Sequence, residues 1–308
     1  MSRTRAVVFA YHDVGVRCLK TLISAGVDIP LVITGRDDPR ERQWYASVAA
    51  TAGDYGLSLI APSEANTAEL ERTVSQLQPD FIFSFYYRSM LGGPLLRGAR
   101  RGALNMHGSL LPKYRGRAPV NWAILKGERE SGATLHYMVE RADAGDIVDQ
   151  LGVPILQDDD AREVFAKVTV AAETILARSL PKLIAGTAAR TPQPLVPGQY
   201  FGRREPEDGR IDWSRPALEI HNLVRAVAPP FPGAFAEVLG ERWEIHRTRL
   251  STRRVSPGEG VRLFAAEGGC HVACSDGGIL WLLAAVTARG PLDLAAVSRK
   301  LTKPVPLS

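Results

Sequence analysis

The clearest fold signal is the stretch of residues 6–34, which reads AVVFAYHDVGVRCLKTLISAGVDIPLVIT. It contains a short apolar run at 6–10, a helical pattern over 14–25 and a second apolar run at 29–34. A short apolar run bounded by polar residues indicates a strand that is buried on both faces. Strand, helix and strand in this order predict a unit in which the two strands are parallel.

The same alternation continues along the first half of the chain. We expect a helix at 44–55, strands at 81–85, 104–106 and 132–139, and a long helix at 161–185. This order predicts an α/β fold with a Rossmann-like, doubly wound parallel sheet. Because such sheets bind ligands at the carboxyl ends of their strands, we look for a site in the segments 11–13, 35–40, 86–91 and 107–119. The first of these has no G-x-G-x-x-G pattern, which disfavours an NAD-dependent enzyme.

The last third of the chain has a different pattern. A segment rich in Pro and Gly at 191–209 is interpreted as a linker, and one more helix is expected at 216–228. Short strands separated by Gly-rich turns follow, at 234–239, 242–248, 261–265, 270–274 and 279–285. Such a succession predicts a small β-barrel or sandwich. We therefore predict two domains, residues 1–206 and 207–308.

Composition narrows the class of protein. The 308 residues are 45% hydrophobic and 23% charged, as in globular proteins, which excludes a disordered chain. No stretch approaches the roughly 18 consecutive apolar residues of a membrane span, and residues 1–10 do not resemble a signal peptide. Three cysteines cannot form a disulfide framework, so we expect a reducing, cytoplasmic compartment.

The net charge of +5 raises the question of nucleic-acid binding, which needs a clustered basic face. Residues 1–206 contain three more basic than acidic residues, and residues 207–308 contain two more. This even spread indicates an arginine-rich surface and predicts no nucleic-acid partner. The histidines also lack metal-ligand spacing, so no metal is expected.

The densest run of functional residue types is 105–119, NMHGSLLPKYRGRAP. Asn105 and His107 are two apart at a strand end, so both side chains point to the same side. An amide beside an imidazole suits carbonyl chemistry, because the amide stabilises an oxyanion and the imidazole moves a proton. A turn in which both side chains bond the backbone is the alternative. Asp143, in a turn closed by Gly145, could support a neighbouring histidine, although an Asp before Gly is usually only a turn residue.

Taken together, these segments resemble a known family. The pattern Asn-x-His-x-Ser-Leu-Leu-Pro-x-x-Arg-Gly, followed by Asp-x-Gly, is similar to the 10-formyltetrahydrofolate-dependent formyltransferases. The resemblance implies a Rossmann-like formyltransferase domain followed by an OB-like β domain. It also implies catalysis by Asn105, His107 and Asp143, with direct attack of an amine on the formyl carbon and no metal.

Further segments resemble the formyltransferase domain of the bifunctional enzyme that modifies UDP-4-amino-4-deoxy-L-arabinose for lipid A. These sugar-type segments are 8–13, 83–88, 107–119, 141–145, 201–204 and 225–228. This implies 10-formyltetrahydrofolate as donor and a UDP-linked amino sugar as acceptor. The implied donor-binding residues are Ser89, Met90, Leu91, Arg117, Val139, Glu140, Arg141 and Ala142, and the acceptor-binding residues are Tyr87, Arg88, Arg203 and Arg204. Ordinary packing is the alternative for Met90 and Leu91, and a solvated side chain for each arginine. The chain, ending at Ser308, is expected to lack the decarboxylase half, so the oligomeric state and a separate decarboxylase partner stay open.

Three other functions are weighed against this one. A methionyl-tRNA formyltransferase shares the chemistry, but its relatives are expected to carry a basic insertion after the second strand. Here the loop 35–42 has three acidic residues among three arginines, which disfavours a polyanion. A formyltetrahydrofolate hydrolase leaves the sugar-type segments unexplained. A non-catalytic nucleic-acid-binding protein needs stacking aromatics in a basic groove, whereas Trp243 and Trp281 fit an apolar core.

Overall fold

The computed structural model describes residues 3–36, 43–194, 200–258 and 260–307. The chain divides into two compact units, each described here by itself. The first comprises Met1–Pro119, Ser131–Val153 and Ala166–Gly202, and the second comprises Val120–Glu130, Pro154–Phe165 and Arg203–Ser308. The domain boundary at residue 206 stays a prediction.

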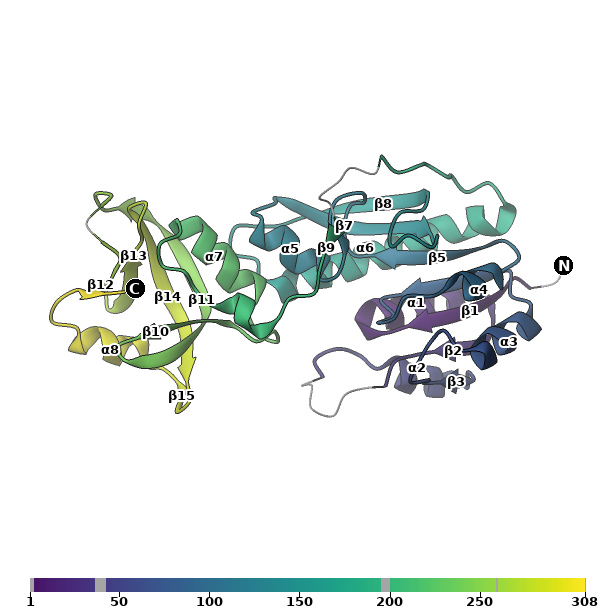
Figure 1. The fold of residues 1–308 in the computed structure, drawn as a ribbon, viewed down its shortest axis with the longest axis horizontal. Coiled ribbons are helices and arrows are strands. Elements are labelled where there is room, and N and C mark those ends of the chain that lie inside the picture. The colour runs from purple at the N-terminus through teal and green to yellow at the C-terminus, as the bar shows by residue number, and fades with distance from the viewer. Residues whose placement is uncertain (1–2, 37–42, 195–199, 259, 308) are drawn as a thin grey trace. The chain divides into compact units, whose positions relative to one another are not determined.

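A seven-stranded sheet forms the centre of the first unit (Figure 1). Its strands, in spatial order, are β3 (Leu59–Ile60), β2 (Asp28–Ile33), β1 (Arg5–Ala10), β4 (Phe81–Phe85), β5 (Gly102–His107), β7 (Glu130–Tyr137) and β8 (Ile147–Pro154). The first five are parallel, which confirms the predicted Rossmann-like sheet. Strand β7 runs antiparallel to β5, a direction that the sequence pattern did not indicate.

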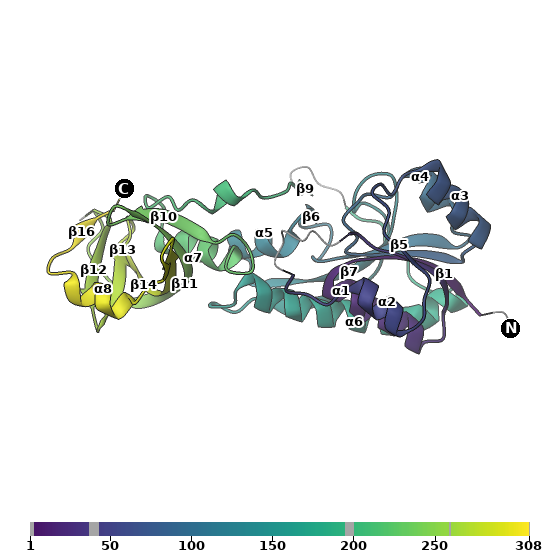
Figure 2. The same cartoon turned by 90° about the horizontal axis from the view of Figure 1, so that it is seen from below.

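Helices cover both faces of this sheet (Figure 2). On one face lie α1 (His12–Ser24), α2 (Val48–Asp54) and α6 (Ala161–Ala185), and on the other lie α3 (Ala68–Leu77) and α4 (Gly93–Arg97). Every residue from Ala6 to Ala10 is fully buried. Within β1, Val7 and Phe9 pack into a cluster with Leu70, Val74 and Leu95 of the helices. Because both faces are covered, the strand is apolar throughout. For this reason its sequence could be recognised as a buried strand.

Several boundaries differ from the predictions. Helix α2 begins at Val48 rather than at residue 44, because the Ser47 side chain accepts a hydrogen bond from the Ala50 amide at 3.2 Å and caps the helix there. Helix α6 has the predicted bounds, although Pro181 lies inside it. Strand β3 and helices α3 and α4 were not predicted. The part of the predicted linker at 195–199 lies outside the described residues.

The second unit is built on an antiparallel sheet that curls into a half-barrel, consistent with the OB-like prediction (Figure 1). Its strands, in spatial order, are β10 (Ala234–Val238), β11 (Glu241–Arg254), β14 (Gly278–Thr287), β13 (Gly269–Ala273), β12 (Arg262–Ala266) and β16 (Val305–Pro306), with β15 (Gly290–Pro291) paired to β14. Helices α7 (Ala217–Ala226) and α8 (Leu294–Lys300) accompany it. Trp243 is 2% exposed and belongs to the core as expected, whereas Trp281 is half-buried and stacks on His271.

Within the described ranges, no helix is both long and apolar enough to cross a membrane.

Candidate active site

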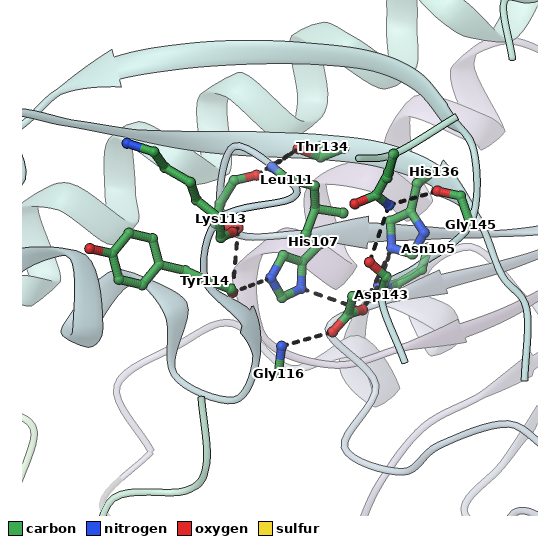
Figure 3. Close-up of polar contacts among 12 residues, drawn as sticks. Asn105, His107, Leu111, Lys113, Tyr114, Gly116, Thr134, His136, Asp143 and Gly145 are labelled. Atoms are coloured by element: carbon green, nitrogen blue, oxygen red, sulfur yellow. Dashed lines mark hydrogen bonds and ion pairs between the residues drawn. The ribbon is translucent and has the colours of Figure 1, made fainter. Parts of the chain in front are cut away.

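The predicted catalytic residues meet at the end of β5 (Figure 3). Alternate residues of a strand point to the same face, so Ala103, Asn105 and His107 share one face of the sheet. Strand β7 places His136 directly opposite Asn105. Because opposite residues of paired strands also share a face, a second histidine joins the group. This residue was missed as a site residue, since only the register between β5 and β7 brings it there.

Asp143 comes from the loop between β7 and β8, which holds an unusual backbone conformation. The residue has φ 49°, in the left-handed region that is uncommon for side chains other than Gly. A Cβ atom at Gly145 would lie 2.0 Å from the carbonyl oxygen of Tyr137, so only Gly fits there. The Gln193 side chain donates hydrogen bonds to the carbonyls of Asp143, at 3.1 Å, and Gly145, at 2.6 Å. The Asp-x-Gly pattern therefore reflects a tight turn that aims the carboxylate at the histidines.

The Asp143 carboxylate stays ionised although it is largely buried. Burial by itself raises the pKa, but the positive charge that His107 and His136 carry when protonated, the hydrogen bond that a protonated His136 can donate, and the Gly116 amide together outweigh it. The Gly116 N–H donates to Oδ2 at 3.0 Å. The net result is an Asp143 pKa well below its usual range. The group supplies a fixed negative charge beside two imidazoles.

His107 is oriented by a backbone carbonyl. Its Nε2 lies 2.8 Å from the Tyr114 oxygen, which can only accept, so Nε2 carries a hydrogen. In the neutral ring the lone pair is therefore on Nδ1, 3.6 Å from Oδ1 of Asp143. That distance is beyond a hydrogen bond but within reach of an ion pair once Nδ1 is protonated. The orienting contact of a catalytic triad is thus made here by Tyr114, while Asp143 faces the basic nitrogen.

The loop that carries Tyr114 is itself fixed by hydrogen bonds. The Ser109 hydroxyl donates to the Lys113 carbonyl at 2.6 Å, which closes the loop on itself. Thr134 of β7 joins it to the sheet, because its hydroxyl donates to the Ser109 carbonyl and accepts from the Leu111 amide. The Ser-Leu-Leu-Pro segment therefore serves to hold the carbonyl that orients His107.

The orientation of the Asn105 amide follows from His136. The His136 Nδ1 lies 2.8 Å from the Tyr137 carbonyl and must donate to it, so its Nε2 is the acceptor in the neutral ring. Asn105 Nδ2 lies 3.2 Å from that Nε2 and 3.4 Å from Asp143 Oδ1. The amide therefore turns its N–H groups toward these two acceptors. The longer contact, to Asp143, is the weaker one and can give way to a developing oxyanion.

We expect His136→Ala to lower kcat by about 10- to 100-fold, because the Asn105 amide loses the acceptor that orients it. The KM values for both substrates should change less than kcat, and His136→Gln, which keeps a side-chain acceptor, should recover part of the rate. Steady-state kinetics with each variant measures this. An unchanged kcat in a folded His136→Ala protein would contradict the positioning role.

The lowered pKa of Asp143 makes the stability of the folded protein depend on pH. The pKa of Asp143 is lower in the folded state than in the unfolded chain. As the pH falls, the unfolded chain therefore takes up a proton at this carboxylate before the folded protein does. The carboxylate thus contributes stability above its ordinary pKa of 3.8, which is lost as the pH falls below that value. We expect the unfolding free energy of the wild type to fall as the pH drops below 3.8, and that of Asp143→Asn to fall less, as measured by denaturant unfolding at each pH. An equal fall in both proteins would contradict the lowered pKa of Asp143.

A cavity of about 320 Å³ lies next to the start of β5. Gly102 and Ala103 line it together with Met138, Val139 and Glu140 from the loop after β7. Because Ala103 and Asn105 share one face of the strand, the cavity lies on the same side of the sheet as the polar group. Two predicted donor-binding residues, Val139 and Glu140, thus border a pocket at the start of the strand whose end carries the predicted catalytic residues.

The remaining predicted donor-binding residues have varied surroundings. Leu91 is 7% exposed and belongs to the apolar core, as the packing alternative predicts. Met90 is 55% exposed, and its carbonyl accepts from Asn66. Ser89, Arg117 and Arg141 are exposed and Ala142 is half-buried. Donor binding by these residues stays a prediction.

The predicted acceptor-binding residues fall into two groups. Tyr87 packs edge-on against Phe9, with ring centroids 5.3 Å apart, which is a packing role. The Arg88 guanidinium lies 4.4 Å from the centre of the Tyr11 ring. Arg203 and Arg204 belong to the second unit, where Arg203 pairs with Glu205 at 3.4 Å and Arg204 donates to the Asp208 carbonyl. Their roles toward an acceptor stay predictions.

No group of three or more His, Cys, Asp or Glu side chains in the described part of the chain is arranged to hold a metal ion. All three cysteines are buried, and burial raises the pKa of the Cys18 thiol.

A parallel α/β sheet that carries an amide, an imidazole and a fixed carboxylate at a strand end has the equipment of an enzyme that catalyses attack on a carbonyl carbon. Comparison with known families is more specific. Residues 6–180 match the formyl transferase family and residues 203–294 match the formyl transferase C-terminal domain, so the chain belongs to the formyl transferase family and is a formyltransferase.

Solved structures with the same fold include several sugar N-formyltransferases. One, from Helicobacter canadensis, was solved with folinic acid and dTDP-3-aminofucose; it is 21% identical, with a TM-score of 0.74 over 91% of this chain and 99% of that one. The sugar 3N-formyltransferase WlaRD, solved in the presence of dTDP and 5-N-formyltetrahydrofolate, is also 21% identical, with a TM-score of 0.73 over 95% and 99%. A third, from a Shewanella species, is 19% identical, with a TM-score of 0.63 over 82% and 99%.

Proposed function

We propose that the protein transfers the formyl group of 10-formyltetrahydrofolate to the amine of a nucleotide-linked amino sugar. The observation that carries the proposal is the meeting of Asn105, His107 and Asp143 at the end of β5 in a member of the formyl transferase family. Sugar N-formyltransferases among the proteins of the same fold support the class of acceptor.

The acceptor that we propose is UDP-4-amino-4-deoxy-L-arabinose, with a role in lipid A modification inside the cytoplasm. Its support is the resemblance of the segments at 8–13, 83–88 and 201–204 to the enzymes that act on this sugar nucleotide. Two of the proteins named above, the one from Helicobacter canadensis and WlaRD, were solved with a dTDP-sugar and with dTDP. The assay must therefore vary both the nucleotide base and the sugar of the acceptor.

The cavity at the start of β5 is the place that we propose for the donor. Its volume of about 320 Å³ lies at the small end of the range for ligand pockets. That size suits the bicyclic head of a folate with the remainder of the molecule outside. Met138 and Val139 offer apolar contact there, and Glu140 offers a carboxylate for ring N–H groups. Binding at this place would direct the formyl group along the face of β5 toward Asn105.

When bound, the donor supplies the formyl carbon that the acceptor amine attacks. A bond forms between the amine nitrogen and this carbon, and the bond from the carbon to the folate nitrogen breaks. His107 takes the amine proton at Nδ1, the nitrogen left basic by the hydrogen bond to Tyr114, and returns it to the departing nitrogen. Asp143 stabilises the protonated ring. The Asn105 amide donates to the formyl oxygen, a contribution of about 3–4 kcal/mol.

The test is an acceptor panel. Purified protein is incubated with 10-formyltetrahydrofolate and, separately, with UDP-4-amino-4-deoxy-L-arabinose, several UDP- and dTDP-linked amino sugars, and methionyl-tRNA. Mass spectrometry of the sugar nucleotides should detect one added formyl group. Omission of the acceptor measures hydrolysis of the donor.

Formylation of methionyl-tRNA without any sugar nucleotide would refute the proposal and favour the tRNA enzyme. Residues 37–42, on which the sequence argument against tRNA rests, lie outside the described residues, so this arm of the panel carries particular weight. Donor hydrolysis without formylation of any acceptor would favour the hydrolase.

A further inference from the structure

Arg115 is a buried arginine that has no counter-ion among the residues that the structure describes. The residue is 3% exposed. Its Nε is buried without a hydrogen-bond partner, and among the described residues no side chain forms an ion pair with its guanidinium. Burying a charged group without a partner is costly, and such groups in proteins are normally paired. A bound anion would supply the partner that this charge lacks.

The backbone on either side of Arg115 holds the active site. The carbonyl of Tyr114 orients His107, and the amide of Gly116 bonds Asp143. Residues Arg115–Gly116 form the short strand β6, which pairs with β9 (Tyr200–Phe201). Gly116 has φ 98°, and a Cβ there would meet the Phe201 carbonyl at 2.3 Å. Arg115 therefore sits on a segment held firmly between the catalytic groups and β9.

The position of Arg115 relative to the cavity distinguishes the two substrates. The cavity borders Ala103, near the start of β5, whereas Tyr114 contacts His107 at the end of that strand. At a rise of about 3.3 Å per residue, these two positions are roughly 13 Å apart along β5. Asn105 lies between them. A donor in the cavity and an acceptor beside Arg115 would thus approach the reacting centre from opposite ends.

We propose that Arg115 binds the diphosphate of the acceptor and so places the sugar amine at His107. This inference rests on the proposed function for the identity of the acceptor. Guanidinium is always charged and donates paired hydrogen bonds that match phosphate oxygens. A phosphate oxygen would supply the acceptor that the buried Nε lacks in the free protein. The glutamate carboxylate of the donor is the other anion in the reaction, and because its tail is joined at the reacting nitrogen, the binding of folinic acid is what distinguishes it from the diphosphate.

Two measurements on one variant test this assignment. Arg115→Met keeps much of the side-chain volume and removes the charge, so it should raise the acceptor KM at least tenfold and leave the donor KM within twofold. Because an unpaired buried charge is removed, the variant should also melt at the same temperature as the wild type or about 2–4 °C higher. An arginine with a purely structural role would instead lower the melting temperature when replaced. Arg72→Met, which removes an exposed arginine from α3, is the matched control and should change neither quantity.

Binding is measured separately from turnover. Isothermal titration of the wild type with UDP, dTDP and inorganic pyrophosphate should detect binding that Arg115→Met loses at least tenfold. Uridine and thymidine, which lack phosphates, should bind both proteins equally. Folinic acid tests the donor carboxylate, and its affinity should not depend on Arg115.

The outcomes separate this inference from the proposed function. If a sugar nucleotide is formylated and Arg115→Met has an unchanged acceptor KM, the inference is wrong and the function stands. If no sugar nucleotide is formylated but pyrophosphate binds through Arg115, the anion site stands and the acceptor class is wrong. A loss of folinic acid affinity instead of phosphate affinity would assign Arg115 to the donor and overturn the inference.

Discussion

Replacing His107 by Asn will lower kcat by about 10²- to 10⁴-fold, the usual contribution of a general base. The Asn side chain reaches only about the position of Nδ1, so the contact of Nε2 with the Tyr114 carbonyl is lost as well. The hydrogen bonds of Ser109 and Thr134 do not involve His107 and should keep the loop folded. What is lost is the basic Nδ1, which lies 3.6 Å from the Asp143 carboxylate. The other histidine of the site, His136, cannot replace it, because its Nε2 accepts a hydrogen bond from Asn105.

The measurement is kcat with saturating donor and acceptor, together with circular dichroism and a melting curve. Asn105→Ala should also abolish most of the turnover, since the oxyanion loses its donor. His246→Ala, a histidine replacement in the second unit, is the control and should retain activity. A folded His107→Asn protein with kcat within threefold of the wild type would exclude His107 as the base.

Gly145→Ala will damage the site without touching a reacting group. The added methyl would lie 2.0 Å from the Tyr137 carbonyl, a backbone atom that cannot move cheaply because it also accepts from His136. The turn must open, and Asp143 then leaves the histidines. We expect a loss of about 1–3 kcal/mol of unfolding free energy from overpacking. We also expect about a 10²-fold loss of kcat from the displaced carboxylate.

The matched control is Gly53→Ala. Gly53 lies within α2, and a Cβ there would meet nothing within 4 Å. Alanine should therefore stabilise the protein by about 0.5–1 kcal/mol and leave kcat unchanged. Denaturant unfolding of both variants measures the difference. Equal stabilities of Gly145→Ala and Gly53→Ala would refute the steric account of the Asp-x-Gly turn.

The buried strands of the first sheet could be predicted because their apolar character is local. Strand β4 has the predicted bounds, since both faces of Phe81–Phe85 are covered and every residue is buried. The start of α2 was predicted too early, at residue 44 instead of Val48. Trp44 and Tyr45 fit a helical pattern but instead pack around His12. The two-residue strand β3 pairs only at the sheet edge and carries too little pattern to detect.

In the candidate site, too, some residues could be predicted from local patterns and others only from tertiary contacts. Asn105, His107 and Asp143 were identified from motif and resemblance, and the fold brings them together. His136 looks like any histidine in an apolar strand until the register sets it opposite Asn105. Arg115 looks like a surface arginine among many until its burial is known.

By itself, the sequence determined the fold class, the family-like motif and the chemical types available at the strand end. Those properties are local, because hydrophobic period and residue spacing act within a few residues along the chain. Only the tertiary structure decided which nitrogen of His107 is basic, which groups keep Asp143 ionised and which arginine lacks a partner. Each of these depends on distances of a few ångströms between residues far apart in the chain. Such distances are set by strand register and by buried turns, and burial is what makes an unpaired charge costly.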